Sequence, residues 1–182
     1  FTGEKEKFLS ELHLLTSKPV FYVMNVDQDE LKSNGSCLRS MIEWASKERS
    51  KWVVICGDLE AELAELQEEE REEFRKDLGF EGSSLSRLIQ VGYEILTLVT
   101  FYTTVSSELK AWTVPGGTPA PRAAGKIHSD MERGFIRAEV VSYSDFVACG
   151  SEYQAREKGF LRSEGKEYLI RDGDIVHFRF NV

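Results

Sequence analysis

Two short polar segments, each placed directly after an apolar run, are the residues of this 182-residue chain best suited to recognising a ligand. The segment Asn25–Gln28 (NVDQ) follows the run Pro19–Met24, and Cys56-Gly57 follows Trp52–Ile55. Such apolar runs are typical of buried parallel strands, and ligands of doubly wound sheets bind at the carboxyl ends of the strands. We therefore treat the two segments as one candidate site.

The side-chain amide of Asn25 has the chemistry to hydrogen-bond the edge of a purine and to brace a neighbouring loop. Each segment also has a simpler explanation. An asparagine after a strand is commonly a turn residue, and a buried cysteine beside a glycine turn, as at Cys56-Gly57, needs no ligand. The residues alone leave both interpretations open.

A second group of residues could hold RNA, because basic side chains interleaved with aromatic ones provide phosphate contacts and stacking surfaces. The aromatic side chains Trp112, Phe135 and Tyr143 lie near these cations in the sequence, although the first two also fit a core. Neighbouring acidic residues, such as Asp130 and Glu139, dilute the positive charge. The candidate RNA-binding residues are Arg122, Lys126, Arg133 and Arg137.

Several catalytic patterns do not occur in these 182 residues. The sequence contains no G-x-x-x-x-G-K-[ST] and no D-x-x-G after a strand, so it offers no loop to wrap phosphates and place Mg²⁺. The histidines lie far apart without metal-ligand spacing, as do the cysteines. We expect no catalytic residue, no metal site and no nucleotide hydrolysis by this chain alone.

The residue pattern predicts the elements that position these groups. Helical spacing at the start (Phe8, Leu12, Leu15) indicates the end of a helix. A helix over 38–48 between the two apolar strands gives a parallel, right-handed βαβ unit. Further helices are predicted over 59–78, with an acidic outer face, and from a serine cap at Ser83 or Ser84.

From Leu98 onward the pattern changes to a mixed sheet. Strands are predicted over 98–102, 109–114, 135–143, 168–170 and 175–180, with a short Ala-rich helix before the third strand and helical segments over 144–158. A strand–strand–helix–strand order within about 85 residues suits a β-grasp fold.

Composition and charge limit the classes of partner that the chain is expected to bind. Hydrophobic residues are 41% and charged residues 30%, no apolar run approaches the ~18 residues that span a bilayer, and no signal peptide opens the chain. The net charge of −8 lies entirely in residues 1–107 (12 Lys+Arg against 20 Asp+Glu), whereas residues 108–182 are neutral (11 against 11). We therefore expect no membrane or DNA partner, and RNA contact only through the second half.

The second half resembles the TGS domain that closes the YchF / Obg-like ATPase family. The resemblance is close over Leu98–Val182 and looser over Pro19–Tyr93. The sequence departs from the family at Pro115-Gly116, where a basic pair is usual, and at Met131, where Phe is usual. The matching segments are 111–113, 117–118, 120–121, 123–128, 133–140, 164–168, 172–176 and 178–182.

The resemblance assigns nucleotide-binding roles to the first site. Asn25 begins the family's base-recognition motif, Val26 stands where guanine-specific enzymes have Lys, and Gln28 stands at the base-selecting position. Because Gln28 is uncharged, the choice between ATP and GTP stays open. Cys56 and Gly57 resemble the motif whose small residue and backbone amide contact the base.

The resemblance implies an α/β chain that is the C-terminal part of an Obg-like P-loop NTPase. Residues 1–17 end a helical arm, 18–97 complete the nucleotide-binding domain as a parallel βαβ unit, and 98–182 form a β-grasp TGS domain. The whole protein is then expected to be cytoplasmic, to hydrolyse ATP (GTP less readily) with Mg²⁺ held by upstream residues, and to associate with ribosomes. The alternative is a stand-alone β-grasp interaction module without nucleotide function.

Overall fold

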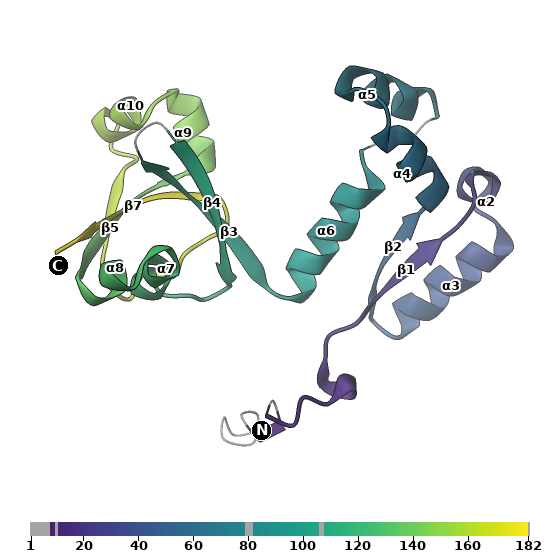
Figure 1. The fold of residues 1–182 in the computed structure, drawn as a ribbon, viewed down its shortest axis with the longest axis horizontal. Helices are drawn as coiled ribbons and strands as arrows, with labels where there is room; N and C mark the ends of the chain where they lie inside the picture. The colour runs from purple at the N-terminus through teal and green to yellow at the C-terminus, as the bar shows by residue number, and fades with distance from the viewer. Residues whose placement is uncertain (1–7, 10, 79–81, 106–107, 182) are drawn as a thin grey trace. The chain divides into compact units, whose positions relative to one another are not determined.

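The computed structural model describes residues 8–9, 11–78, 82–105 and 108–181, which form two compact units that divide between Leu96 and Thr97 (Figure 1). Of the helix predicted at the start of the chain, residues 1–7 and 10 lie outside the described residues, and Phe8, Leu9 and Glu11 are helical. Leu15–Ser17 form a short 3₁₀ helix, η1, and Phe8, Leu12 and Leu15 expose their side chains.

The first unit is built on two parallel strands, as predicted. Strand β1 (Phe21–Asn25) pairs along its whole length with β2 (Lys51–Ile55). The connection between them contains α2 (Gln28–Ser33) and α3 (Ser36–Lys47), and α3 lies along one side of the strand pair while α6 (Ser84–Ile95) lies along the other (Figure 1). This parallel pairing brings the ends of both strands to one edge.

The strands are less buried than their apolar sequences predict. Met24 and Val53 are buried, but Val20, Val23 and Trp52 are exposed. Met24 packs with Leu38 and Ala45 of α3 in a small cluster. The prediction of full burial was wrong because, among the described residues, this sheet has only two strands, and so little apolar surface is covered.

The single helix predicted over 59–78 is two helices, α4 (Gly57–Ala64) and α5 (Glu68–Asp77). Gln67 caps α5 in a reciprocal capping box with Glu70. The Arg71 side chain donates from Nε to the carbonyl of Leu63 and from Nη2 to that of Leu66, each at 2.9 Å. These bonds tie α5 to the end of α4 and to the loop after it, which stabilises the break between the two helices. The predicted serine cap is confirmed: the Ser83 hydroxyl accepts from the Ser86 amide at 3.3 Å.

The second unit contains a five-stranded mixed sheet in the order β4-β3-β7-β5-β6, in which β3 and β7 are parallel and the other neighbours antiparallel. This agrees with the predicted β-grasp class. Its elements are β3 (Leu98–Val105), β4 (Glu108–Pro115), α7 (Ala120–Ile127), α8 (Ser129–Arg133), β5 (Phe135–Ser142), α9 (Tyr143–Cys149), α10 (Glu152–Glu157), β6 (Arg162–Glu164) and β7 (Asp174–Phe180).

The core of the second unit lies between α7 and one face of the sheet. The Phe178 ring meets Phe101 edge-on at 5.9 Å between centroids, and the buried alanines of α7 allow the helix to approach closely. On the other face, α9 and α10 cover a smaller cluster that includes Val141 and Ile175.

One predicted strand, over 168–170, is reduced to an isolated bridge between Leu169 and Pro119. The backbone of this segment bonds instead to the loop before α7: the Ile170 amide donates to Thr118 and the Tyr168 carbonyl accepts from Ala120. The edge strand beside β5 is β6, which the sequence pattern did not reveal because it is only three residues long.

Candidate functional site

The structure joins the two strand ends of the first unit. Asn25 and Ile55 are register partners, and the Val26 amide donates to the Ile55 carbonyl at 2.9 Å. Beyond this bond the Asn25 side chain reaches the start of α4, where its Oδ1 accepts from the Gly57 amide at 3.0 Å. Asn25, Val26 and Gly57 are thus adjacent at one edge of the sheet.

The remaining predicted residues of this site differ in how far they reach the surface. Cys56 is buried with Leu59 and Leu63, so its thiol belongs to the core and only its backbone is near the edge. Gln28 is half-buried at the first position of α2. The carboxylate of Asp27, the residue before Gln28, accepts from the Glu30 amide at 2.7 Å and caps α2. Asp27 is therefore already committed to a structural role.

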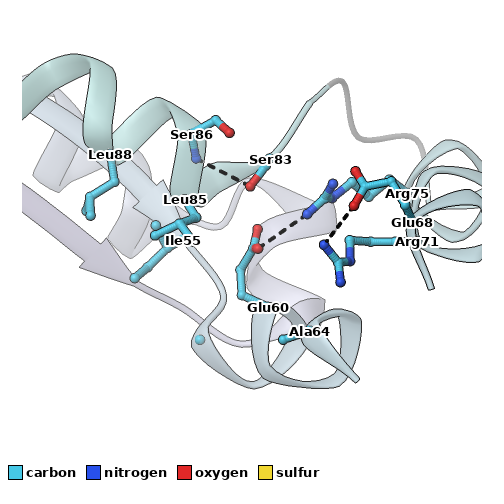
Figure 2. Close-up of a pocket in the computed structure, with 11 residues that line it drawn as sticks. Ile55, Glu60, Ala64, Glu68, Arg71, Arg75, Ser83, Leu85, Ser86 and Leu88 are labelled. Atoms are coloured by element: carbon cyan, nitrogen blue, oxygen red, sulfur yellow. Dashed lines mark hydrogen bonds and ion pairs between the residues drawn. The ribbon is translucent and has the colours of Figure 1, made fainter. Parts of the chain in front are cut away.

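A hollow of about 350 Å³ lies beside the end of β2 (Figure 2). Its apolar wall is formed by Ile55, Leu85 and Leu88, and Gly57 is the one predicted nucleotide-binding residue that lines it. Figure 2 shows Arg75 reaching from α5 to Glu60 on α4, with 3.6 Å between Nη2 and Oε2.

Ser84 provides two further donors to Glu60. The Ser84 amide donates to Glu60 Oε1 at 3.1 Å, and the Ser84 hydroxyl donates to the same oxygen. The polar groups of this hollow are thus largely engaged with one another. The contacts that line this hollow mainly hold α4, α5 and α6 together.

The described residues contain no group of three or more His, Cys, Asp or Glu side chains able to hold a metal ion. In the same part of the chain, no helix is both long enough and apolar enough to cross a membrane. The strand-end site therefore offers the side-chain amides of Asn25 and Gln28, backbone groups and a glycine surface, which is chemistry for recognising a polar edge.

The structure divides the candidate RNA-binding residues of the second unit between two faces. Arg122 and Lys126 lie four residues apart on the exposed side of α7, and no described carboxylate is within ion-pair distance of either. Arg133, at the end of α8, donates to Asp130, and this hydrogen bond lowers the pKa of the Asp130 carboxyl. The positive charge of Arg133 is therefore compensated by Asp130.

The predicted aromatic partners of this set are mostly unavailable for stacking. Trp112 packs against the core and donates from Nε1 to the Thr103 hydroxyl at 3.0 Å, and Phe135 is buried. Tyr143 is exposed.

Arg137 lies on the opposite face of the sheet from α7, because its neighbours along β5, Ala138 and Val140, alternate into the core. Its cross-strand partner on β7 is Arg179, and two positions along β5 is Glu139. Arg156 of α10 completes a group that we call the arginine cluster: Arg137, Arg156 and Arg179 around Glu139.

Glu139 is buried at 8% exposure and binds all three arginines. Its Oε1 accepts from Arg137 at 2.9 Å, and its Oε2 accepts from Arg179 Nε and Nη2 at 3.2 and 3.0 Å. Arg156 Nη2 lies 3.5 Å from Oε2. The bonds from Arg179 and Arg137 lower the pKa of Glu139 to about 2, so the carboxylate stays ionised at neutral pH.

Sequence reasoning found Arg137 but missed Arg156 and Arg179. The alternation Arg137-x-Glu139 on a predicted strand indicates that both side chains share a face. Placing Arg179 opposite Arg137 requires the strand register, and Arg156 comes from a helix that only tertiary packing brings to the sheet.

Comparison with known proteins matches residues 98–181 to the family model YchF-GTPase_C, described as "Protein of unknown function (DUF933)". The chain is 47% identical over 184 residues to the Ribosome-binding ATPase YchF of Bacillus subtilis (strain 168), covering 100% of this chain and 50% of the relative. It is 45% identical over 181 residues to the protein of the same name from Escherichia coli O157:H7, with the same coverage. The chain thus spans about half the length of the curated relatives it matches.

Solved structures give the same picture. The Schizosaccharomyces pombe YchF GTPase superposes with a TM-score of 0.89 at 31% identity, covering 98% of this chain and 48% of that one. A GTP binding protein from Pyrococcus horikoshii OT3 superposes with a TM-score of 0.61 at 15% identity, which indicates a similar fold and nothing more.

Proposed function

Because the chain belongs to the YchF / Obg-like ATPase family, we propose that it is the C-terminal part of a cytoplasmic P-loop protein that hydrolyses ATP and associates with ribosomes. Its parts are the end of a helical arm (1–17), the end of the nucleotide-binding domain (18–97) and a TGS domain (98–182). The stand-alone interaction module is not favoured, since the similarity to these relatives covers the whole chain.

The observation that supports the nucleotide role best is the bond from the Gly57 amide to Asn25 Oδ1. With Oδ1 engaged, the Asn25 Nδ2 donor is left to face a ligand, and a purine edge carries matching acceptors. Val26, Gln28 and the backbone at Cys56 are assigned to the same base site by the family resemblance. The phosphate groups and Mg²⁺ would be held by residues of the whole protein outside this chain, where Mg²⁺ supplies charge neutralisation for phosphoryl transfer.

The ribosome role rests on the names of the relatives and on the charge of the second unit. Residues 108–182 are neutral in sum, and the sequence-derived RNA contacts are Arg122, Lys126, Arg133 and Arg137. Of these, Arg122 and Lys126 present uncompensated charge from one helix. The neutral second unit lacks the long-range repulsion from ribosomal RNA that the acidic first unit has.

Two assays on the full-length protein test the proposal: ATP hydrolysis with Mg²⁺, and co-sedimentation with ribosomes. We expect turnover of ATP and a ribosome-bound fraction that falls as salt is raised. A full-length protein that neither binds a purine nucleotide nor pellets with ribosomes contradicts the assignment.

A further inference from the structure

The arginine cluster lies on the same sheet face as α9 and α10, beside the apolar contact that these helices make. The helices pack over Val141 and Ile175, and Arg156 of α10 reaches Glu139 next to that contact on β5. Together with β6 the cluster lines an open hollow of about 430 Å³.

The cluster holds more positive charge than its own carboxylate neutralises. Among the described residues, Glu139 is the one acid within ion-pair distance of Arg137, Arg156 or Arg179, so three cations share one anion. Arg162, which also lines the hollow, differs, because Glu164 and Asp174 lie 3.7 and 3.9 Å from its guanidinium. The cluster therefore keeps a surplus of two positive charges.

Glu139 arranges these cations without consuming their hydrogen-bonding capacity. A guanidinium has five N–H donors, and Glu139 engages Arg137 and Arg156 through Nη2 alone. Both side chains are about half exposed, which leaves donors facing solvent. A fixed carboxylate beneath two outward guanidinium groups preorganises them for a second anion.

We propose that the arginine cluster binds the phosphate backbone of RNA, a contact that gives the proposed ribosome association a specific surface. Guanidinium forks fit phosphate oxygens, and the outward guanidinium groups of Arg137 on β5 and Arg156 on α10 suit neighbouring phosphates of one chain, while Arg179 holds Glu139 through Nε and Nη2. Protein partners usually bury apolar anchors at the centre of their interface, and Leu161 is the one apolar side chain that lines this hollow. The site lies on the opposite sheet face from α7 and is independent of Arg122 and Lys126.

Fluorescence anisotropy of the 182-residue chain with a labelled oligouridylate of about 12 nucleotides tests the site across a salt series. Each lost phosphate contact flattens the slope of log affinity against log salt by about 0.7 for single strands. We therefore expect Arg156→Ala to flatten it by about 0.7, and Arg137→Ala/Arg156→Ala by about 1.4. The matched control, Lys110→Ala, removes an exposed cation that pairs with Glu108 on β4 and should leave the slope unchanged.

A wild-type slope in Arg156→Ala, with the fold verified by circular dichroism, overturns the site. Arg156 contacts Glu139 only at 3.5 Å, so this single variant carries the test if the double variant does not fold. Competition with oligoglutamate and with inorganic phosphate identifies the ligand. Displacement of RNA by oligoglutamate at equal charge indicates a site for acidic protein segments, and equal displacement by free phosphate indicates a single-phosphate site. Either result overturns RNA binding.

Co-sedimentation of the full-length protein with ribosomes separates this site from the proposed function. If the protein pellets with ribosomes but its RNA affinity is independent of Arg156, the site is wrong and the function stands. If RNA binding depends on Arg156 but the protein does not pellet, the cluster binds RNA and the ribosome assignment fails.

Discussion

Asn25 Oδ1 accepts a hydrogen bond from the backbone amide of Gly57 at 3.0 Å, so a side chain from the end of one strand fixes the loop that follows the other. A Cβ added at Gly57 would stand 3.4 Å from the same oxygen, which is ordinary contact. An alanine side chain would therefore fit at position 57 beside this oxygen. The hydrogen bond depends on the side chain of Asn25.

The first prediction concerns this bond in the 182-residue chain. Asn25→Ala removes the acceptor and should speed hydrogen exchange of the Gly57 amide about fivefold, the equivalent of about 1 kcal/mol. Asn25→Asp keeps an acceptor oxygen and should leave exchange close to wild type. Exchange of individual amides followed by NMR measures both, and equal protection in all three proteins would show that the bond is absent in solution.

The second prediction concerns base selectivity of the full-length protein. Gln28 carries no charge, and the neighbouring Asp27 carboxylate is engaged by the Glu30 amide, so neither residue supplies a free carboxylate to select guanine. We expect weak or reversed discrimination against ATP, and Gln28→Asp alone should not restore guanine preference because Val26 also departs from that pattern. A preference for GTP of about a thousandfold in competition binding, some 4 kcal/mol, contradicts this interpretation.

The third prediction concerns acid stability. The pKa of Glu139 lies at about 2 in the folded chain, against 4.5 for an ordinary glutamate. Its contribution to stability is therefore complete above about pH 4.5 and is lost as the pH falls toward about 2. Glu139→Gln should lower the stability of the second unit by roughly 2 kcal/mol at neutral pH and weaken its pH dependence in that window. Urea unfolding at several pH values, followed by Trp112 fluorescence in chains that also carry Trp44→Phe and Trp52→Phe, checks both effects. A variant with the wild-type acid profile would exclude Glu139 as the source.

The fourth prediction concerns the exposed side of α7 in the full-length protein. Arg122→Glu/Lys126→Glu reverses two uncompensated charges and should lower ribosome co-sedimentation, most clearly at low salt. The fold should survive because both side chains point to solvent. Lys166→Glu, an exposed charge reversal outside the helix, is the control. Equal pelleting of the folded double variant and wild type across a salt series leaves this pair as solvated surface.

The sequence predicts the fold well where periodicity and punctuation are strong. The two apolar runs become paired parallel strands, and the Ser83 cap begins α6 where expected. It fails where a long-range side-chain bond decides the local structure. Arg71 donates to the carbonyls of Leu63 and Leu66, and these two bonds, which no spacing rule reveals, link α5 to the end of α4 where the predicted helix over 59–78 breaks.

The candidate site shows the same division. The adjacency of Asn25 and Gly57 follows from two strand ends in a parallel pair, so it could be predicted. The grouping of Arg137 with Arg156 and Arg179 could not, because it depends on the register of β5 against β7 and on the packing of α10. The predicted set that included Arg137 is split by the alternation of β5 across the sheet.

Calorimetric titration of ATP and GTP into the full-length protein and its Asn25 variants tests the central claim, that this strand end recognises a nucleotide base. Asn25→Asp keeps the acceptor for Gly57 but replaces the Nδ2 donor with a second carboxylate oxygen. We predict that it weakens nucleotide binding by about 1–3 kcal/mol while Gly57 stays protected, and that Asn25→Ala weakens binding at least as much. Unchanged affinity for both nucleotides in both variants would contradict the account and leave Asn25 as a brace between two strands.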